Sequence, residues 1–349
     1  MRKLVQIVEK TQLNLSGLNL YTEAATGNYN ISAALGVLAG ARAVHCVARS
    51  NRFGSAQLAI AQTNELVQSI QNVNQTRVTY SEGHDYTALA EADIVTNSNP
   101  LRPLDEVAIK AMKKGGVISL MYEPWEYRQG DIDLKAAQAK DVWIVGVNEM
   151  HPTIPCFYSA GILPLKGMLM AGLEVFSSDV LLVCANRLIE YALPVLSKTC
   201  ASVHFVDGNI FQGEVPAGCK RIQPGEVNNR HYDALLLFDS PDTVKWNVSS
   251  TSDALWPIQS LGHWDVCVQM MGDVVRSDFE DVKFVPEKEP PRGYMGFNPA
   301  DLGVDLVIRT VVSGLKAGQE AIAFLQNGNT KTDAEKVSFE WIKSFYNRA

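Results

Sequence analysis

The sequence predicts an α/β protein with two tandem doubly wound parallel-sheet domains, a cleft between them and a long C-terminal helix that returns across the cleft. Short apolar segments of strand length alternate with helical segments in both halves of the chain. The strand segments are apolar on both faces, which is typical of parallel sheets covered by helices. A chain of 349 residues with 46% hydrophobic content also exceeds the usual size of one core, which favours two domains.

Residues 16–52 predict the βαβ unit around which the first domain is built. A buried strand at 18–25 leads through the tight turn Thr26-Gly27-Asn28 into an apolar helix at 31–39 and a second strand at 43–48. Such a turn leaves backbone N–H groups at the start of a helix, where an anion is favoured. The same alternation then predicts helices at 55–71, 86–91, 104–112 and 133–139, and strands at 77–80, 93–96, 117–121 and 142–147.

Right-handed crossovers would give these six strands the order 3-2-1-4-5-6. Three prolines between residues 152 and 164 end the first half, and a helix at 165–176 is expected to cross to the second domain. There we expect strands at 180–184, 203–207, 234–238 and 266–270, and helices at 187–198 and 254–261. A Pro/Gly-rich loop at 285–299 precedes a long helix at 302–325 and another at 334–346. The expected segments are 1–164, 165–300 and 301–349.

Charge and cysteine usage argue against several classes of partner. The net charge is −7 and no long basic run exists, so nucleic acid and anionic membranes are not expected partners. The six cysteines lack C-x-x-C spacing, as expected for buried thiols in a reducing cytoplasm. The longest apolar stretch, at 161–176, is interrupted by Lys166 and Glu174 and is too short to span a bilayer. We expect a cytoplasmic protein with a small-molecule substrate. A homodimer is also expected, as is common for this class of fold.

Residues 91–121, EADIVTNSNPLRPLDEVAIKAMKKGGVISLM, resemble the two-domain NAD(P)-dependent dehydrogenases, in particular the D-isomer-specific 2-hydroxyacid and shikimate dehydrogenase types. In those enzymes, whose domains are Rossmann-like, this stretch runs from strand four through a polar loop beside the nicotinamide to strand five. The resemblance therefore implies that Asn97, Ser98 and Asn99 line the cofactor.

The segment at 47–52, VARSNR, is similar to the end of strand two in the NADP-preferring members. This similarity implies that Arg49, Ser50 and Arg52 meet the 2′-phosphate, which a guanidinium can bind bidentately. The alternative is a loop with two exposed arginines that has no ligand.

Both strand-to-helix turns depart from the G-x-G-x-x-G pattern whose glycines admit a pyrophosphate. The Thr26-Gly27-Asn28 turn has a single glycine, yet its residues are the better candidates for cofactor contacts. In the second domain the three glycine positions fall on Cys184, Asn186 and Ile189, in a frame that ends on Asp207. We expect the second domain to keep the topology without holding a dinucleotide in the usual way, so NAD(P) is assigned to the first.

Ligands of open α/β sheets bind outside the carboxyl ends of the strands, whatever the ligand is. Polar residues that follow the first-half strands are Glu23, Thr26, Gly27, Asn28 and Tyr29 after the first; Asn97, Ser98 and Asn99 after the fourth; Glu123, Trp125, Glu126 and Arg128 after the fifth; and Asn148, Glu149 and His151 after the sixth. Of these, Glu23, Tyr29, Trp125, Arg128 and Glu149 are the expected substrate contacts. A surface pair of Glu126 and Arg128, with Trp125 covering the domain edge, is the alternative.

The expected acid–base groups are Glu123, Glu126 and His151, with Glu149 placed to orient the histidine. A structural His151 is the alternative, and Glu123 is then the rival base. No His, Cys or Asp group has metal-ligand spacing, and G-x-S-x-G and Walker A motifs are absent, so no metal is expected.

Three functions stay open at this point. The resemblance implies an NAD(P)-dependent oxidoreductase that acts on a polar metabolite in the interdomain cleft. A lyase, hydrolase or transferase on a nucleotide or sugar-like metabolite would use the carboxylates without redox chemistry. A non-catalytic metabolite-binding protein would use the same crevice as a sensor.

Overall fold

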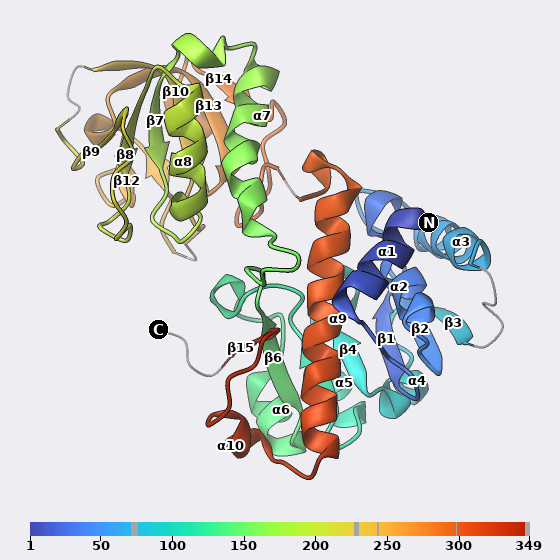
Figure 1. Ribbon diagram of the computed structural model, residues 1–349. Helices are drawn as coiled ribbons and strands as arrows, with labels where there is room; N and C mark the ends of the chain where they lie inside the picture. Colours follow the sequence, from blue (N-terminus) through green and yellow to red (C-terminus); the bar gives the residue numbers. More distant parts are fainter. Residues whose placement is uncertain (71–75, 227–229, 243, 298, 346–349) are drawn as a thin grey trace. The chain divides into compact units, whose positions relative to one another are not determined.

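The computed structural model describes residues 1–70, 76–226, 230–242, 244–297 and 299–345. The chain forms two compact units, each with its own parallel sheet (Figure 1). The first unit comprises residues 1–156 and the chain from 303 onward, and the second comprises residues 157–302. The second unit is therefore an insertion into the first.

The first unit is built on a seven-stranded sheet in which an antiparallel edge strand joins six parallel strands. Its strands are β1 (Asn19–Glu23), β2 (Ala43–Ala48), β3 (Arg77–Glu82), β4 (Ile94–Thr96), β5 (Val117–Ser119), β6 (Trp143–Val147) and β15 (Ile342–Ser344). The order β15-β6-β5-β4-β1-β2-β3 confirms the expected 3-2-1-4-5-6 arrangement and adds β15 beside β6. The strand order reverses between β1 and β4, which is where sheets of this kind bind ligands.

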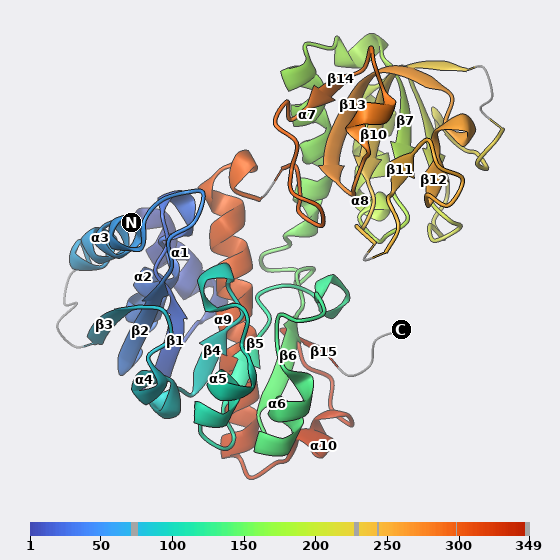
Figure 2. The ribbon, with the colours of Figure 1, turned by 180° about the vertical axis from the view of Figure 1, so that it is seen from behind.

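Helices cover both faces of this sheet (Figures 1 and 2). They are α1 (Arg2–Thr11), α2 (Ser32–Leu38), α3 (Ala56–Gln68), α4 (Tyr86–Glu91), α5 (Glu106–Ala111), α6 (Leu134–Lys140), α9 (Val304–Gln326) and α10 (Lys331–Ala334). The sequence sets four of the starts, because the side chains of Ser55, Asp85, Asp105 and Asp133 accept hydrogen bonds from first-turn amides of α3, α4, α5 and α6. Residue 71, the expected end of α3, lies outside the described residues.

The long helix α9 lies along β4, β5 and β6 of the first unit. Successive residues of a strand point to opposite faces, so Ser119 of β5 donates to the Gly314 carbonyl of α9 at 2.8 Å, while Ile118 packs with Ile109 of α5 on the other face. The helix approaches closely because Gly314 has no side chain: a Cβ there would overlap Met121. The helix expected at 302–325 is thus confirmed, and its packing helps position the end of β5.

The second unit repeats the same topology. Its sheet has the order β14-β13-β10-β7-β8-β9, which is again 3-2-1-4-5-6 in chain order. The elements are α7 (Ile162–Ala171), β7 (Asp179–Val183), α8 (Ile189–Thr199), β8 (Ser202–Val206), β9 (Cys219–Arg221), β10 (His231–Phe238), β13 (His263–Met271) and β14 (Lys283–Val285), with a small pair of β11 (Val248–Ser249) and β12 (Trp256–Pro257). The prediction of two Rossmann-like sheets is confirmed.

Three expected helices are wrong. The segment expected as a helix at 254–261 contains β12 and a 3-10 turn at Ile258–Ser260, because Pro257 has no N–H for a helix interior. The helix at 334–346 is replaced by α10 and then β15, since the open edge of β6 accepts a strand there; residue 346 lies outside the described part. The crossing helix at 165–176 is instead α7, which ends at Gly172 with φ 81° and packs its Gly167 against Val268 of β13 in the second unit.

Among the described residues, no helix combines the length and apolar character needed to cross a membrane. Within the same residues, no set of three or more His, Cys, Asp or Glu side chains is arranged to hold a metal ion.

Candidate functional site

Three carboxylates from two adjacent strand ends meet at the carboxyl edge of the first sheet. Glu123 and Glu126 follow β5, and Glu149 follows β6. Their negative charges act on one another, and those of Glu126 and Glu123 raise the pKa of Glu149. Met121, with φ 66°, turns the chain sharply out of β5 into the loop that bears the first two. The site thus brings together residues predicted as catalytic and as substrate-binding.

The loop after β5 holds its carboxylates by local hydrogen bonds. The Trp125 indole Nε1 donates to Glu123 Oε2 at 3.1 Å, and the Glu123 amide donates to Glu126 Oε1 at 3.1 Å. The side chain of Glu126 is half-buried. The exposed Arg128 lowers the pKa of Glu126, whereas burial and the charge of Glu123 raise it. The indole ring therefore lies at the carboxylates, as a substrate contact would require.

Glu149 differs from the other two carboxylates in its hydrogen bonding. It is 7% exposed, and no hydrogen bond or ion pair to its carboxylate is present in the described part of the chain. Its backbone is fixed, because the Cys156 amide donates to the Glu149 carbonyl at 2.7 Å. The Cys156 thiol in turn lies beside Thr310 of α9. Cys156 therefore connects the loop that carries Glu149 to α9.

Burial changes the proton affinity of this site. Removal from water, together with the charge of Glu123, raises the pKa of Glu126 to about 7. Burial and the two neighbouring carboxylates raise the pKa of Glu149 well above the usual range. A carboxyl group with a pKa near 7 exchanges protons at neutral pH and is suited to general acid–base chemistry.

His151 faces the C-terminal segment. Its ring stacks on Trp341, with centroids 3.7 Å apart and planes at 12°, and its Nδ1 accepts from the Thr153 amide at 3.2 Å. Its Nε2 lies 3.8 Å from Glu340. The residue is 9% exposed. Its neighbours are thus those of a packing histidine, and the orienting contact expected from Glu149 is not among the hydrogen bonds of the described residues.

The residues after β4 have different hydrogen-bond partners. Asn97 Nδ2 donates to the Tyr122 hydroxyl at 2.7 Å, and that hydroxyl donates to Asp131 at 3.2 Å. Ser98 Oγ lies 3.2 Å from the Thr96 hydroxyl, whereas Asn99 begins the 3-10 turn Asn99–Leu101. The fully buried Asn97 therefore belongs to a polar chain with Tyr122, a residue that the sequence analysis missed because a Tyr after a strand carries no specific signal.

Glu23, predicted to contact substrate, is engaged inside the protein. Its carboxylate accepts hydrogen bonds from the hydroxyls of Ser32, Thr22 (2.7 Å) and Thr96 (3.3 Å). The residue is 4% exposed. These bonds tie the end of β1 to β4 and to the start of α2, so the carboxylate holds the turn in place.

The turn after β1 also uses its amides internally. The Ala25 amide donates to Thr63 Oγ1 at 3.1 Å, and the Gly27 amide donates to Gln62 Oε1 at 2.9 Å. Both acceptors lie on α3. A pyrophosphate seated as in a glycine-rich turn needs such amides for itself, so the usual cradle does not fit here.

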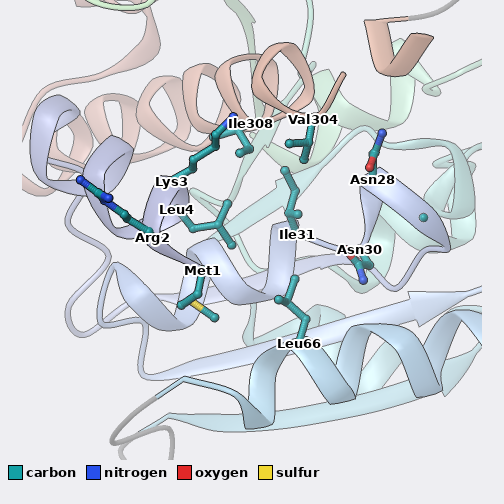
Figure 3. Close-up of a pocket in the computed structure, with 11 residues that line it drawn as sticks. Met1, Arg2, Lys3, Leu4, Asn28, Asn30, Ile31, Leu66, Val304 and Ile308 are labelled. Atoms are coloured by element: carbon teal, nitrogen blue, oxygen red, sulfur yellow. The ribbon is translucent and has the colours of Figure 1, made fainter. Parts of the chain in front are cut away.

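The exposed side of this turn nevertheless borders a pocket of about 370 Å³ (Figure 3). Apolar side chains make most of its wall: Leu4, Ile31, Leu66, Val304 and Ile308. Gly27, Asn28 and Asn30 line one side, and Arg2 and Lys3 of α1 line the other. The volume lies in the range of small-molecule sites. The sequence analysis missed the contributions of α1 and α9, because helices distant in sequence give no signal at a strand end.

The residues after β2 are partly engaged. Arg49 Nη1 donates to the Arg102 carbonyl at 2.7 Å, and Ser50 Oγ accepts from the Ala56 amide at 3.0 Å near the start of α3. The exposed Arg52 places its guanidinium 4.7 Å from the centre of the Phe53 ring. Of the two arginines predicted to meet a 2′-phosphate, Arg52 is exposed and Arg49 is half-buried. Tyr29 is also exposed.

The equivalent turn of the second unit is closed by its own side chains. Asn186, at the second glycine position, donates to the Phe238 carbonyl and accepts from the Leu188 amide, both at 2.9 Å. Asp207, which would meet a ribose, is 2% exposed and accepts from Arg221 at 2.9 Å and from the Phe211 amide. The residues present therefore do not fit a dinucleotide in this unit.

A polar network that sequence analysis missed closes the neighbouring strand end of the second unit. Asp239, after β10, accepts from the Trp256 indole at 2.7 Å, from the Ala185 amide at 3.0 Å and from Asn247 at 3.2 Å. A single Asp after a strand gives no hint of such partners, because Trp256 and Asn247 come from the small β11–β12 insertion.

Comparisons with known proteins place the chain by fold alone. No protein-family model matches the sequence, and no curated protein matches it. Among solved structures, a dipicolinate synthase chain from Bacillus halodurans aligns with a TM-score of 0.50 and 11% identity, over 89% of this chain and 99% of that one. A D-lactate dehydrogenase from Treponema pallidum gives 0.48 and 10%, over 89% and 98%. An NAD-dependent formate dehydrogenase from Staphylococcus aureus gives 0.45 and 12%, over 86% and 98%. The likeness to the dipicolinate synthase chain lies in the two-domain Rossmann-like fold.

Proposed function

We propose that this chain is a small-molecule enzyme of the oxidoreductase class that acts on a polar metabolite at the strand ends of its first unit. The observation that carries the proposal is the group of Glu123, Glu126 and Glu149, in which burial and mutual repulsion bring the pKa of Glu126 to about 7. These residues follow β5 and β6, at the edge where such sheets bind ligands. The fold shared with dehydrogenases supports the reaction class.

Glu126 is the proposed acid–base residue. It is half-buried and therefore reachable, and its pKa lets it hold or release a proton near neutral pH. Glu123 is the weaker candidate because Trp125 already donates to it. His151 is weaker still, because the Trp341 ring covers its face. Glu126 would exchange the proton that accompanies reduction or oxidation of the substrate.

For the cofactor we propose NAD(P) on the first unit, in a mode that leaves the Ala25 and Gly27 amides with their partners on α3. The pocket beside Gly27 and Asn28 supports this placement, and the exposed Arg52 supports a preference for NADP. When bound, a nicotinamide would supply the hydride acceptor or donor. The roles assigned to the carboxylates do not depend on its position.

A second candidate is a lyase, hydrolase or transferase that uses the same carboxylates without redox chemistry. It is favoured by the internal hydrogen bonds of Ala25, Gly27 and Asn186, which occupy both phosphate-binding turns. The two candidates differ in whether a dinucleotide binds.

Titration of the purified chain with NADPH and NADH, followed by intrinsic fluorescence and melting temperature, separates the candidates. The proposal expects saturable binding, weaker NADPH binding in Arg52→Ala, and unchanged binding in the control Arg187→Ala, whose side chain is exposed in the second unit. Glu126→Gln should retain cofactor binding and lose turnover of 2-oxo acids and other polar carbonyl compounds. Absence of dinucleotide binding at millimolar concentration would remove the redox class and leave the second candidate. Ligand binding without turnover of any compound would indicate a sensor.

A further inference from the structure

The edge of the first sheet opposite the candidate site carries a pocket of its own. The pocket has a volume of about 560 Å³ and lies where β1, β2 and β3 begin. Half of the described residues that line it are cationic, namely Arg42, Arg77 and Lys113, and the others are Asn19, Ala43 and Glu91. The pocket therefore concentrates positive charge, although the chain as a whole has a net charge of −7.

The guanidinium of Arg42 is held at this pocket by a buried amide. Its Nε donates to Asn19 Oδ1 at 2.9 Å, and its two Nη groups have no partner in the described part of the chain. Asn19 is 8% exposed and is itself fixed, because its Nδ2 donates to the Glu91 carbonyl at 2.8 Å and its backbone amide donates to Asp93 at 2.7 Å. A guanidinium held in this way loses little freedom when it binds an anion.

The other two cations of the pocket have acidic partners of different kinds. Lys113 pairs with Asp93, whose side chain is 13% exposed. Arg77 Nη2 lies 3.0 Å from Glu91 Oε2, and both of these side chains are more than half exposed. An exposed pair of this kind contributes at most about 1 kcal/mol, so Arg77 can turn to a ligand at small cost. Three cations thus share two carboxylates, and the charge of Arg42 is left for an anion.

We propose that this pocket binds a phosphate group, either as the free ion or as the phosphate of a small organic molecule, with Arg42 and Arg77 as its contacts. A guanidinium can donate two parallel hydrogen bonds to phosphate oxygens. A phosphate monoester carries a charge of about −1.5 to −2 at neutral pH and has three acceptor oxygens, so it can serve both arginines at once. The volume lies in the range of small-molecule sites and leaves room for an organic body beside the phosphate.

This pocket is separate from the carboxylates of the candidate site. The strand β1 runs from Asn19 at the pocket to Glu23 at the opposite edge, a distance of about 13 Å at about 3.3 Å per residue. Glu126 and Glu149 follow β5 and β6, which are parallel to the rest of the sheet and end at that opposite edge. The inference therefore goes beyond the proposed function, and either can fail without the other.

Calorimetric titration of the full chain with inorganic phosphate, in HEPES buffer at constant ionic strength, tests this site. We expect saturable binding in the millimolar range, and Arg42→Gln should weaken it about tenfold or more, which corresponds to about 1.4 kcal/mol. Arg42→Lys keeps the charge without the planar fork and should bind with intermediate affinity. Arg77→Gln, which removes the second contact, should weaken binding several-fold. The matched control Arg187→Gln, on an exposed side chain of the second unit, should leave the affinity unchanged.

Two further titrations distinguish the sources of the phosphate. Ribose 5-phosphate that binds more tightly than inorganic phosphate would indicate a phosphorylated metabolite, and equal or weaker binding would indicate the free ion. Ribose, which lacks the phosphate, should not bind. Circular dichroism spectra equal to that of the wild type show that the variants are folded.

The inference would be overturned by absence of saturable phosphate binding at millimolar concentration, or by undiminished binding in Arg42→Gln. Binding of ribose as tight as that of ribose 5-phosphate would contradict it as well. Loss of phosphate binding in Arg52→Ala, with retention in Arg42→Gln, would instead move the phosphate to the end of β2 and support the cofactor placement proposed above.

Discussion

His151 and Trp341 lie face to face, with ring centroids 3.7 Å apart and ring planes at 12°. The stack joins the loop after β6 to the C-terminal segment that continues as β15. The Asn148 amide reinforces it by donating to the Trp341 carbonyl at 2.9 Å. The Trp341 amide in turn donates to Glu320 of α9 at 3.1 Å. The C-terminal segment thus supports the loop on which Glu149 lies.

Replacement of Trp341 should destabilise the first unit strongly. The side chain is 5% exposed, and its removal leaves a cavity beside the His151 ring. For Trp341→Ala we expect a loss of about 3–5 kcal/mol in the free energy of unfolding, as for other buried aromatic residues. Urea unfolding followed by circular dichroism measures it. The control Val337→Ala removes an exposed side chain and should change the value by less than about 0.5 kcal/mol. An equal effect of both substitutions would contradict the assigned packing role.

The carboxylate group predicts that stability falls as the pH rises through neutrality. A carboxyl whose folded pKa is raised contributes stability that is fully present below its unfolded pKa and is lost as the pH passes the folded value. For Glu126 this window runs from the ordinary value of 4.5 to about 7, and Glu149 acts in the same direction. We expect the wild type to lose unfolding free energy between about pH 5 and about pH 8, and Glu126→Gln to lose less. Urea titrations at both pH values test this, and parallel losses in the two proteins would refute it.

The sequence predicted the topology and the two strand ends of the candidate site for a simple reason. Short apolar segments show where each strand ends, and the residues that follow, such as Glu126 and Glu149, must then lie at one edge of a parallel sheet. The internal partners of the first turn could not be predicted in this way. Gln62 and Thr63 lie on a helix with no breaker or charge pattern, and only the packing of α3 brings them to Gly27 and Ala25.

The conformation of the C-terminal segment could not be predicted from its local sequence either. The helix expected from residue 334 onward does not form, because the conformation of the described residues 334–345 is fixed by the open edge of β6 and by the stack of Trp341 on His151. Such contacts join residues almost two hundred positions apart, as the hydrogen bond between Asn148 and Glu340 illustrates. Local propensity does not contain that information.

The closed turn of the second unit predicts that Asn186 is a stability residue. Its amide group satisfies the Leu188 amide and the Phe238 carbonyl, and both would lose their partner in Asn186→Ala. We expect a loss of about 1–3 kcal/mol in unfolding free energy, with no change in dinucleotide binding. The adjacent Arg187→Ala, on an exposed side chain, is the control and should have little effect. Weaker NADPH or NADH binding in Asn186→Ala, at unchanged stability, would move the cofactor to the second unit.

The contact between α9 and β5 predicts a graded response to two glycine substitutions. A Cβ on Gly314 would overlap the Met121 side chain and lie 3.2 Å from the Met121 Cα, which cannot move without shifting the end of β5. A Cβ on Gly318 would lie 2.8 Å from Ile94 Cγ2, the end of a side chain. Although alanine favours helices, we expect Gly314→Ala to cost about 1–3 kcal/mol through overpacking and Gly318→Ala to cost less. Because Met121 leads into the loop of Glu123 and Glu126, the first substitution should also lower turnover of 2-oxo acids under the proposed function, which an activity assay measures. Ala323→Ser, on the exposed face of α9, should alter neither property, and a larger cost for Gly318→Ala than for Gly314→Ala would contradict the proposed rigidity of this strand end.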